Sequence, residues 1–130
     1  MTADSAAGVP VTFAEGVLDD VRELTAISSG DDREYAAEVE ALKQRIAELL
    51  VECKGNPFLG ELMGRGLHPE LANCRRVRFD IPSSSGKPRF RLIYRNEPTD
   101  GAPAECRWLT VGPRAGLRAH RKARQRLGPT

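Results

Sequence analysis

Three short runs of alternating apolar and polar residues in the second half of the chain constrain its fold most. They extend over Asn73–Asp80, Arg89–Arg95 and Glu105–Val111. The segments between them, Pro82–Pro88 and Glu97–Pro103, contain the Pro, Gly and Ser residues that are common in loops. Alternation with a period of two is typical of strands with one buried face. The sequence therefore predicts a three-stranded meander.

The first half of the chain predicts a short strand followed by helices. Val9–Phe13 reads as an edge strand, and apolar residues then recur at helical spacing from Ala14 to Ile27, with Thr12 as a candidate cap. A second helix is expected from about Arg33 to Val51, and one further helical turn near Leu59–Met63.

These elements predict a fold of the α+β class. We expect the two N-terminal helices to pack on one face of a small, mostly antiparallel sheet, with a short C-terminal helix within Ala115–Leu127. Residues 1–8 are expected to form a flexible tail and residues 9–130 a single domain, since 130 residues are enough for one modest core. The sheet face away from the helices should be open.

The charges of the two halves are opposite. Residues 1–70 hold 14 acidic and 6 basic side chains, a net charge of −8, whereas residues 71–130 hold 4 acidic and 14 basic ones, a net charge of +10. Twelve of those fourteen cations are arginine, whose planar guanidinium binds two phosphate oxygens at once. This asymmetry indicates either an anionic partner or a solvated basic surface.

Strand alternation suggests where the arginines gather. It places Arg76 and Arg78 on one side of their strand, and Arg89, Arg91 and Arg95 on one side of theirs. If both sets lie on the uncovered face, the sheet presents a groove of exposed arginines.

Other classes of protein fit the sequence less well. No apolar run approaches the roughly 18 residues of a membrane-spanning helix, and the N-terminus lacks the features of a secretory signal. Cys53, Cys74 and Cys106 are odd in number and lack C-x-x-C pairing, which favours reduced thiols in a cytosol. With His68 and His120 as the only histidines, no metal site is expected.

Four blocks of the sequence resemble the RelE/ParE toxin superfamily. Their order and spacing are similar to those of the last three strands and the C-terminal end of a RelE-like toxin, and the resemblance covers roughly the last half of the chain. The blocks are Cys74–Phe79, Arg89–Arg95, Thr110–Arg114 and His120–Leu127.

The resemblance implies the toxin of a bacterial type II toxin–antitoxin system with the RelE-like microbial RNase fold. Such a toxin is a cytoplasmic endoribonuclease that needs no metal or other cofactor, cleaves mRNA in the A site of the 70S ribosome, and is silenced by a cognate antitoxin. No membrane partner is implied.

The resemblance also implies roles for individual residues. Arg91 matches an arginine beside the scissile phosphate, Arg114 matches the arginine that closes the next strand, and His120 stands where the RelE branch usually has tyrosine. These three are the candidate catalytic residues, and we expect their side chains to be exposed in the groove. The candidate RNA-binding residues are Arg76, Arg78, Arg89, Arg95 and Arg121.

Elementary chemistry agrees with this assignment. RNA supplies its own nucleophile, the 2′-hydroxyl, so an enzyme must orient the strand and neutralise the charge that builds on the phosphate. Arginines can do both, and histidine titrates near neutral pH, as proton transfer requires. Two alternatives stay open, namely a ParE-like inhibitor of DNA gyrase and an inactive RNA- or protein-binding member of the fold.

Overall fold

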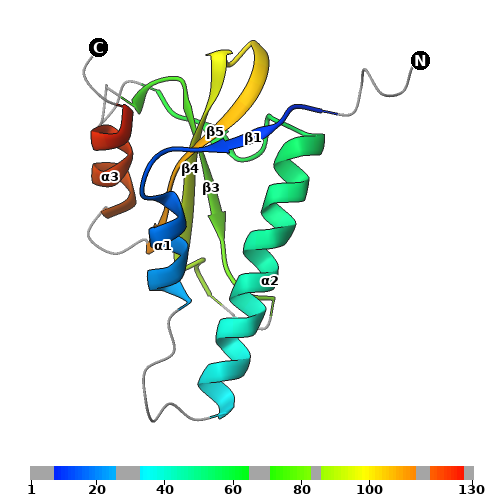
Figure 1. Ribbon diagram of the computed structural model, residues 1–130, viewed down its shortest axis with the longest axis vertical. Coiled ribbons are helices and arrows are strands. Elements are labelled where there is room, and N and C mark those ends of the chain that lie inside the picture. Colours follow the sequence, from blue (N-terminus) through cyan, green and yellow to red (C-terminus); the bar gives the residue numbers. More distant parts are fainter. Residues whose placement is uncertain (1–7, 26–32, 65–70, 83–85, 114–117, 128–130) are drawn as a thin grey trace.

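The computed structural model describes residues 8–25, 33–64, 71–82, 86–113 and 118–127, which form one sheet with three helices around it (Figure 1). The helices are α1 (Val17–Leu24), α2 (Arg33–Gly55) and α3 (Arg118–Leu127). The strands are β1 (Val11–Phe13), β2 (Glu61–Leu62), β3 (Cys74–Phe79), β4 (Phe90–Thr99) and β5 (Ala102–Pro113).

The sheet is mixed, with the strand order β1-β5-β4-β3-β2. The predicted meander is confirmed, because β3, β4 and β5 pair antiparallel, whereas β1 pairs parallel with β5. Two other expectations were wrong. Most of the loop predicted over Glu97–Pro103 belongs to a hairpin in which Thr99 pairs with Ala102. Glu61 and Leu62 form an edge strand on β3 rather than part of a helical turn.

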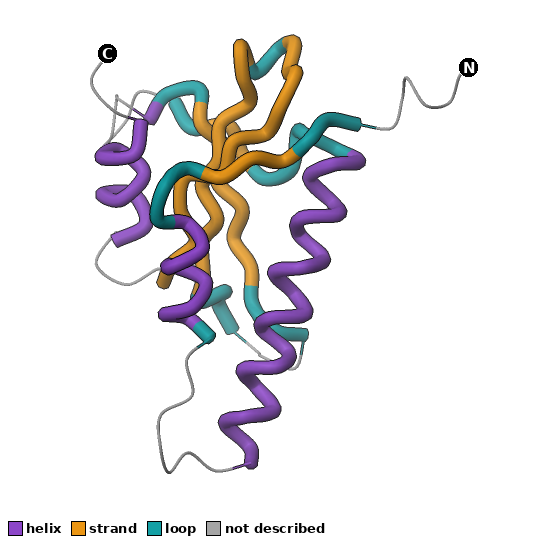
Figure 2. The backbone as a smooth tube through the Cα atoms, viewed as in Figure 1, coloured by secondary structure: helices purple, strands orange, loops and turns teal. Residues whose placement is uncertain are grey.

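Helix α2 packs against the sheet through its C-terminal part, while its first turns extend past the ends of the strands (Figure 2). Its apolar residues recur three or four positions apart and so form a single stripe. Leu42, Ile46, Leu49 and Cys53 are buried from this stripe. They join a core to which the sheet contributes Val77, Leu92, Tyr94, Trp108 and Val111. The α+β class is therefore confirmed, and Tyr94 and Trp108 are core residues.

The placement of the other helices differs from the expected arrangement. Helix α1 begins after Gly16, which has a φ of 95° and forms no side-chain cap, while Thr12 lies in β1 and donates a hydrogen bond to Glu105 (2.6 Å). Asp20 of α1 is buried and bonds to β5 and α3. Helix α3 packs against β5 and β4. Helix α3 is therefore bonded to α1 and packed on the sheet, and is not a separate C-terminal element.

None of the helices in the described ranges is both long and apolar enough to cross a membrane. The three cysteines are free and buried, and burial raises the pKa of each thiol, to about 12 for Cys53 and to about 11 for Cys74 and Cys106. Of the predicted tail, only Gly8 lies within the described residues.

Candidate functional site

The strand register gathers five arginines on one face of the sheet. Residues directly opposite each other in an antiparallel pair lie on the same face, and Arg78 is opposite Arg91, while Arg95 is opposite both Cys74 and Arg107. Alternation along β3 and β4 adds Arg76, which is opposite Ile93. We refer to these residues as the arginine face: Arg76, Arg78, Arg91, Arg95 and Arg107.

Arg91 is the most buried member of the arginine face, with 9% of its surface exposed. Its Nη1 donates hydrogen bonds to the carbonyl oxygens of Pro88 (3.1 Å) and Phe90 (2.9 Å). On β5 the opposite residue is Gly112, which places no side chain beside the guanidinium. The expectation of an exposed Arg91 was wrong, because the backbone around the start of β4 encloses it and holds it in place.

Arg76 and Arg78 share one carboxylate. Glu61 on the edge strand β2 accepts from Arg76 (2.5 Å) and lies 3.0 Å from Nη2 of Arg78. The hydrogen bond from Arg76 and the charges of Arg76 and Arg78 lower the pKa of Glu61, and the charge of Arg91 acts in the same direction. Arg91 lies directly opposite Arg78 on the neighbouring strand and so belongs to the same electrostatic site.

Arg95 and Arg107 also share a carboxylate. Arg95 donates two hydrogen bonds to Glu97, at 2.5 and 3.1 Å, and Arg107 lies 4.0 Å from the same oxygen. Arg107 was missed in the sequence analysis. It could have been predicted, because alternation along the third predicted strand places Arg107 together with Glu105 on the polar side of that strand.

Arg89 lies apart from the arginine face. It forms a bidentate ion pair with Asp80, and this contact lowers the pKa of Asp80 to about 2. Its guanidinium lies over the ring of Phe90, 5.2 Å from the centroid, and the residue lines a small hollow together with Glu38 and Val39 of α2. The expectation that Arg89 and Arg91 share a side was wrong, because Arg89 precedes β4 and its side chain turns towards α2.

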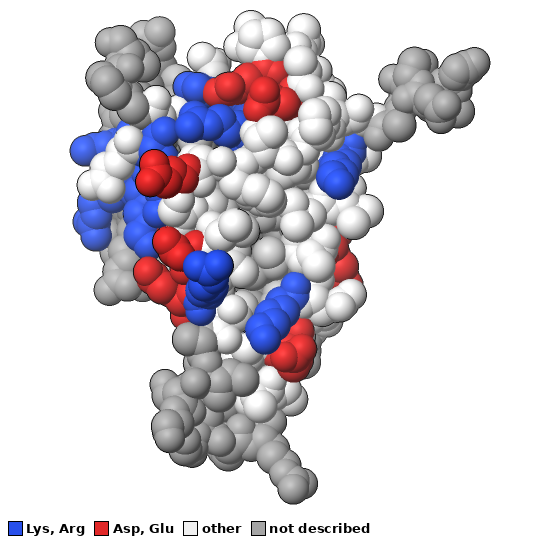
Figure 3. Space-filling view, viewed as in Figure 1, with Lys and Arg blue, Asp and Glu red and all other residues white. Residues whose placement is uncertain are grey.

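Helix α3 brings the predicted C-terminal residues to the sheet. His120 is 6% exposed and Ala123 is fully buried, so these two face inward while Arg121 is exposed. The expectation of an exposed His120 was wrong. Arg114 lies outside the described residues. Figure 3 shows Lys and Arg gathered along the α3 side of the molecule, whereas the surface between α1 and α2 is largely uncharged.

A second cluster of charges, which the sequence analysis missed, holds α1, α3 and β5 together. Asp20 accepts hydrogen bonds from Thr110 (2.7 Å), Lys122 (3.0 Å) and both terminal nitrogens of Arg126. Burial opposes the charged form of this carboxylate, but the bonds from Arg126, Thr110 and Lys122 outweigh it and lower the pKa of Asp20. A side chain at Gly16 would come within 2.8 Å of Arg126, so glycine allows this approach.

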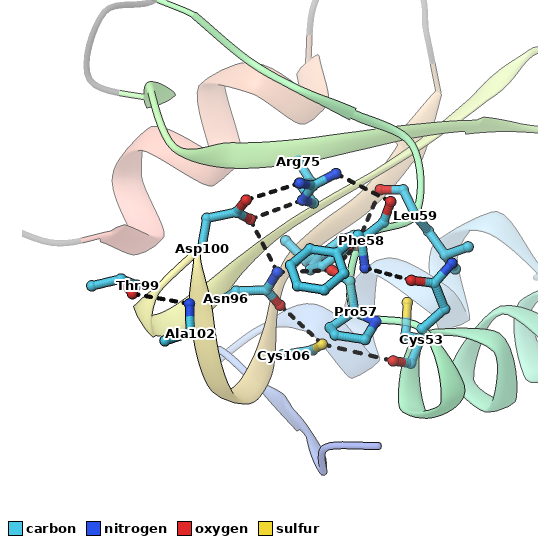
Figure 4. Close-up of polar contacts among 12 residues, drawn as sticks. Cys53, Pro57, Phe58, Leu59, Arg75, Asn96, Thr99, Asp100, Ala102 and Cys106 are labelled. Carbon is cyan, nitrogen blue, oxygen red and sulfur yellow. Dashed lines mark hydrogen bonds and ion pairs between the residues drawn. The ribbon is translucent and has the colours of Figure 1, made fainter. Parts of the chain in front are cut away.

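Arg75 belongs to a third cluster of polar contacts, on the side of β3 opposite Arg76. Asp100 accepts two hydrogen bonds from Arg75, both 2.8 Å long, and the carbonyl of Phe58 accepts a third (Figure 4). Asn96 donates to Asp100 (3.0 Å) and to the carbonyl of Pro57 (2.7 Å). These bonds fasten the segment after α2 to the β4–β5 hairpin.

The arginine face can bind anions. Several guanidinium groups on one rigid sheet suit a polyanion whose phosphates repeat, since each group can donate two hydrogen bonds to one phosphate. Across the described residues, no group of three or more His, Cys, Asp and Glu side chains is placed to hold a metal ion.

Comparison with known proteins identifies the fold. No family model matches the sequence, and no curated protein matches it. A solved structure does match, that of a mutant of the E. coli toxin RelE in the free state. The match has a TM-score of 0.53 and 20% sequence identity, and covers 92% of this chain and 98% of that chain. The chain is therefore similar in fold to RelE.

Proposed function

We propose that the protein is the toxin of a type II toxin–antitoxin system and acts as an endoribonuclease on mRNA in the ribosomal A site. The arginine face carries this proposal. Four arginines selected from the sequence, Arg76, Arg78, Arg91 and Arg95, lie on one face of the sheet. The RelE-like fold is the second support, since RelE is named as a toxin.

The proposed reaction uses the 2′-hydroxyl of the RNA as nucleophile. Its oxygen attacks the adjacent phosphorus, the bond from phosphorus to the 5′-oxygen breaks, and the products are a 2′,3′-cyclic phosphate and a 5′-hydroxyl end. One proton leaves the 2′-hydroxyl and one reaches the departing 5′-oxygen. DNA lacks the nucleophile, which restricts the enzyme to RNA.

Arg91 is proposed to stabilise the charge that develops on the phosphate. Its bonds to the carbonyls of Pro88 and Phe90 orient the guanidinium before substrate arrives. Such a preorganised donor acts more strongly in a site that excludes water. Arg114, which follows β5 in the sequence and lies outside the described residues, is proposed to contribute a second positive charge.

His120 is proposed to transfer one of the two protons. It lies on α3, which packs against β5 and β4, and its ring is buried rather than surface-exposed. A histidine can give or take a proton near neutral pH. Replacement by tyrosine tests this role, because the RelE branch usually carries tyrosine there. We expect His120→Tyr to keep part of the activity that His120→Ala loses.

The remaining basic residues are proposed to bind RNA without taking part in the reaction. Arg76, Arg78 and Arg95 have carboxylate partners that a phosphate can replace. Arg121 is exposed on α3, and Arg89 can contribute only from the edge beside α2. The proposed partners are the 70S ribosome with its mRNA, and an antitoxin with acidic side chains that covers the arginines in the cytoplasm.

Pulse labelling after induction in a bacterium tests the proposal. A ribosome-dependent nuclease should stop incorporation of amino acids first, because intact mRNA disappears from translating ribosomes. DNA synthesis stopping first would instead indicate a gyrase inhibitor. If neither stops at full expression of the folded protein, the toxin proposal is wrong and an inactive binding module is favoured.

A further inference from the structure

Two carboxylates on the arginine face each hold a pair of arginines. Glu61 bridges Arg76 and Arg78 at the side of the face formed by β2 and β3. Glu97 of β4 lies between Arg95 of its own strand and Arg107 of β5. The two bridges have the same chemistry although the four arginines come from three different strands.

Each bridge has the form of an occupied anion site. Two guanidinium groups that lie side by side repel each other, and one shared anion relieves this repulsion. A carboxylate and a phosphate both present oxygen pairs that match the guanidinium fork, so one can take the place of the other. The site therefore has a resident ligand supplied by the chain itself.

Both bridges are partly open to water, although the Arg76 side chain of the first bridge is only 25% exposed. The side chains of Arg78 and Glu61 are 52% and 54% exposed, and those of Arg95 and Glu97 are 31% and 28% exposed. Ion pairs with this exposure contribute little to stability. An incoming phosphate can displace either carboxylate into water without disrupting the core.

We propose that the positions of the Glu61 and Glu97 carboxylates are two phosphate subsites of the arginine face, and that both glutamates act as competing internal ligands. This inference rests on the proposed function for the identity of the ligand, a single-stranded RNA. One phosphate then lies at Glu61, which contacts Arg78, the residue directly opposite Arg91 on β4.

The second subsite lies further along β4. Arg95 follows Arg91 by four residues, a separation of about 13 Å along a strand. Beside Glu97 the surface has an open hollow of about 710 Å³, lined among others by Asn73, Arg95, Glu97 and Thr99. Ligand sites of nucleotide size have volumes of this order. The hollow gives room for the nucleotide attached to the phosphate at Glu97.

Binding of an uncleavable RNA tests the inference. A fluorescent 2′-O-methyl RNA octamer is titrated at low salt with the full chain, and anisotropy is measured. We expect Glu61→Gln and Glu97→Gln each to tighten binding by about twofold to fivefold, the size of a lost exposed ion pair. The matched control is Glu48→Gln, which removes the same charge from the exposed Glu48–Arg45 pair on α2 and should leave binding nearly unchanged.

A double-mutant cycle sharpens the result. The gain from Glu61→Gln should disappear when Arg76 and Arg78 are both replaced by alanine, since no bridge is then left to release. Equal tightening by all three glutamine variants would overturn the inference, because it would indicate only a change in overall charge. Weaker binding by the two face variants, or no binding by any form, would also overturn it.

These outcomes are separate from those of the proposed function. Tighter binding by the two face variants, with no mRNA cleavage on induction, leaves the phosphate subsites in place and rejects the nuclease. Cleavage on induction without tighter binding keeps the nuclease and rejects the subsites.

Discussion

Arg75 and Arg76 are neighbours on β3, yet they face opposite sides of the sheet and have different partners. Arg75 makes two hydrogen bonds to Asp100 and one to Phe58, in a pair whose side chains are 13% and 14% exposed. Arg76 contacts Glu61, whose side chain is 54% exposed and is shared with Arg78. The first arginine holds two segments together, and the second shares a partner whose side chain is more than half exposed.

The difference shows that arginine content alone does not locate a binding surface. The number of bonds and the burial of the carboxylate distinguish an arginine that stabilises the fold from one that can bind a ligand. By the same measure Arg126, bonded to buried Asp20 and to the carbonyl of Leu109, is structural. Arg91 differs from both kinds, since it is buried and donates hydrogen bonds to the backbone carbonyls of Pro88 and Phe90.

The largest expected effect concerns Arg91. Arg91→Ala removes a preorganised positive donor and should lower the rate of mRNA cleavage by about 10²–10³. Arg91→Lys should restore only part of the rate, because the charge is kept and the planar fork is lost. The measurement is cleavage of a reporter mRNA in a translation extract. Because Arg91 is buried, thermal unfolding of each variant is the control, and full activity of a folded Arg91→Ala protein contradicts the proposed role.

The next largest effect concerns Asp20. Asp20→Ala removes the buried carboxylate that Arg126 and Lys122 share and should lower the free energy of unfolding by about 3–5 kcal/mol. Denaturant unfolding measures it. The control is Asp19→Ala, which removes a neighbouring carboxylate that is 70% exposed and should change stability little. Equal losses for both variants would show that Asp20 does not join the helices to β5.

A smaller effect on the free energy of unfolding should distinguish the arginines on the two sides of β3. Arg75→Ala should lower the free energy of unfolding by about 1.5–3 kcal/mol, since charged hydrogen bonds to Asp100 are lost. Arg78→Ala, on the exposed side, should change it by no more than about 0.5 kcal/mol but should weaken RNA binding. Unfolding and anisotropy titrations of both variants give the two readouts. The distinction between structural and ligand-binding arginines fails if the two variants behave alike.

The last expected effect is on the pH dependence of stability. Ion pairing lowers the pKa of Asp80 to about 2, and bonded cations also lower the pKa of Asp20 and Asp100. A lowered pKa in the folded state gives stability that is present above the ordinary Asp value near 3.8 and is lost as the pH falls towards 2. Denaturant unfolding across this range should show the loss, and Asp80→Asn should reduce it. A flat profile would contradict these pairings.

Sequence patterns predicted the sheet and most of the arginine face because both depend on local alternation. Val77, Phe79, Leu92 and Tyr94 all point to the core side of long strands, so the opposite positions follow from a period of two. Arg89 was misplaced because β4 begins one residue later. The two-residue strand β2 is too short to show any period, and so the role of Glu61 was not visible.

Contacts between distant segments could not be predicted in the same way. Asp20 and Arg126 are 106 positions apart, so no local pattern shows that they pair, although helical spacing does place Asp20 on the same side of α1 as Val17 and Leu24. The burial of His120 had a detectable signal, because His120, Ala123 and Leu127 recur at helical spacing and therefore share one side of α3. The many arginine and lysine residues of this segment obscure that buried stripe in the sequence.

Mapping mRNA 5′ ends after induction tests most directly whether the arginine face cleaves RNA. The parent chain and Arg91→Ala are expressed to equal levels in the same bacterium, and 5′ ends are mapped soon after induction. We predict new ends within translated reading frames for the parent, carrying 5′-hydroxyl groups, and a large reduction of the same ends for Arg91→Ala. No new ends with the parent chain, or the same ends at the same frequency with the folded variant, would contradict the account.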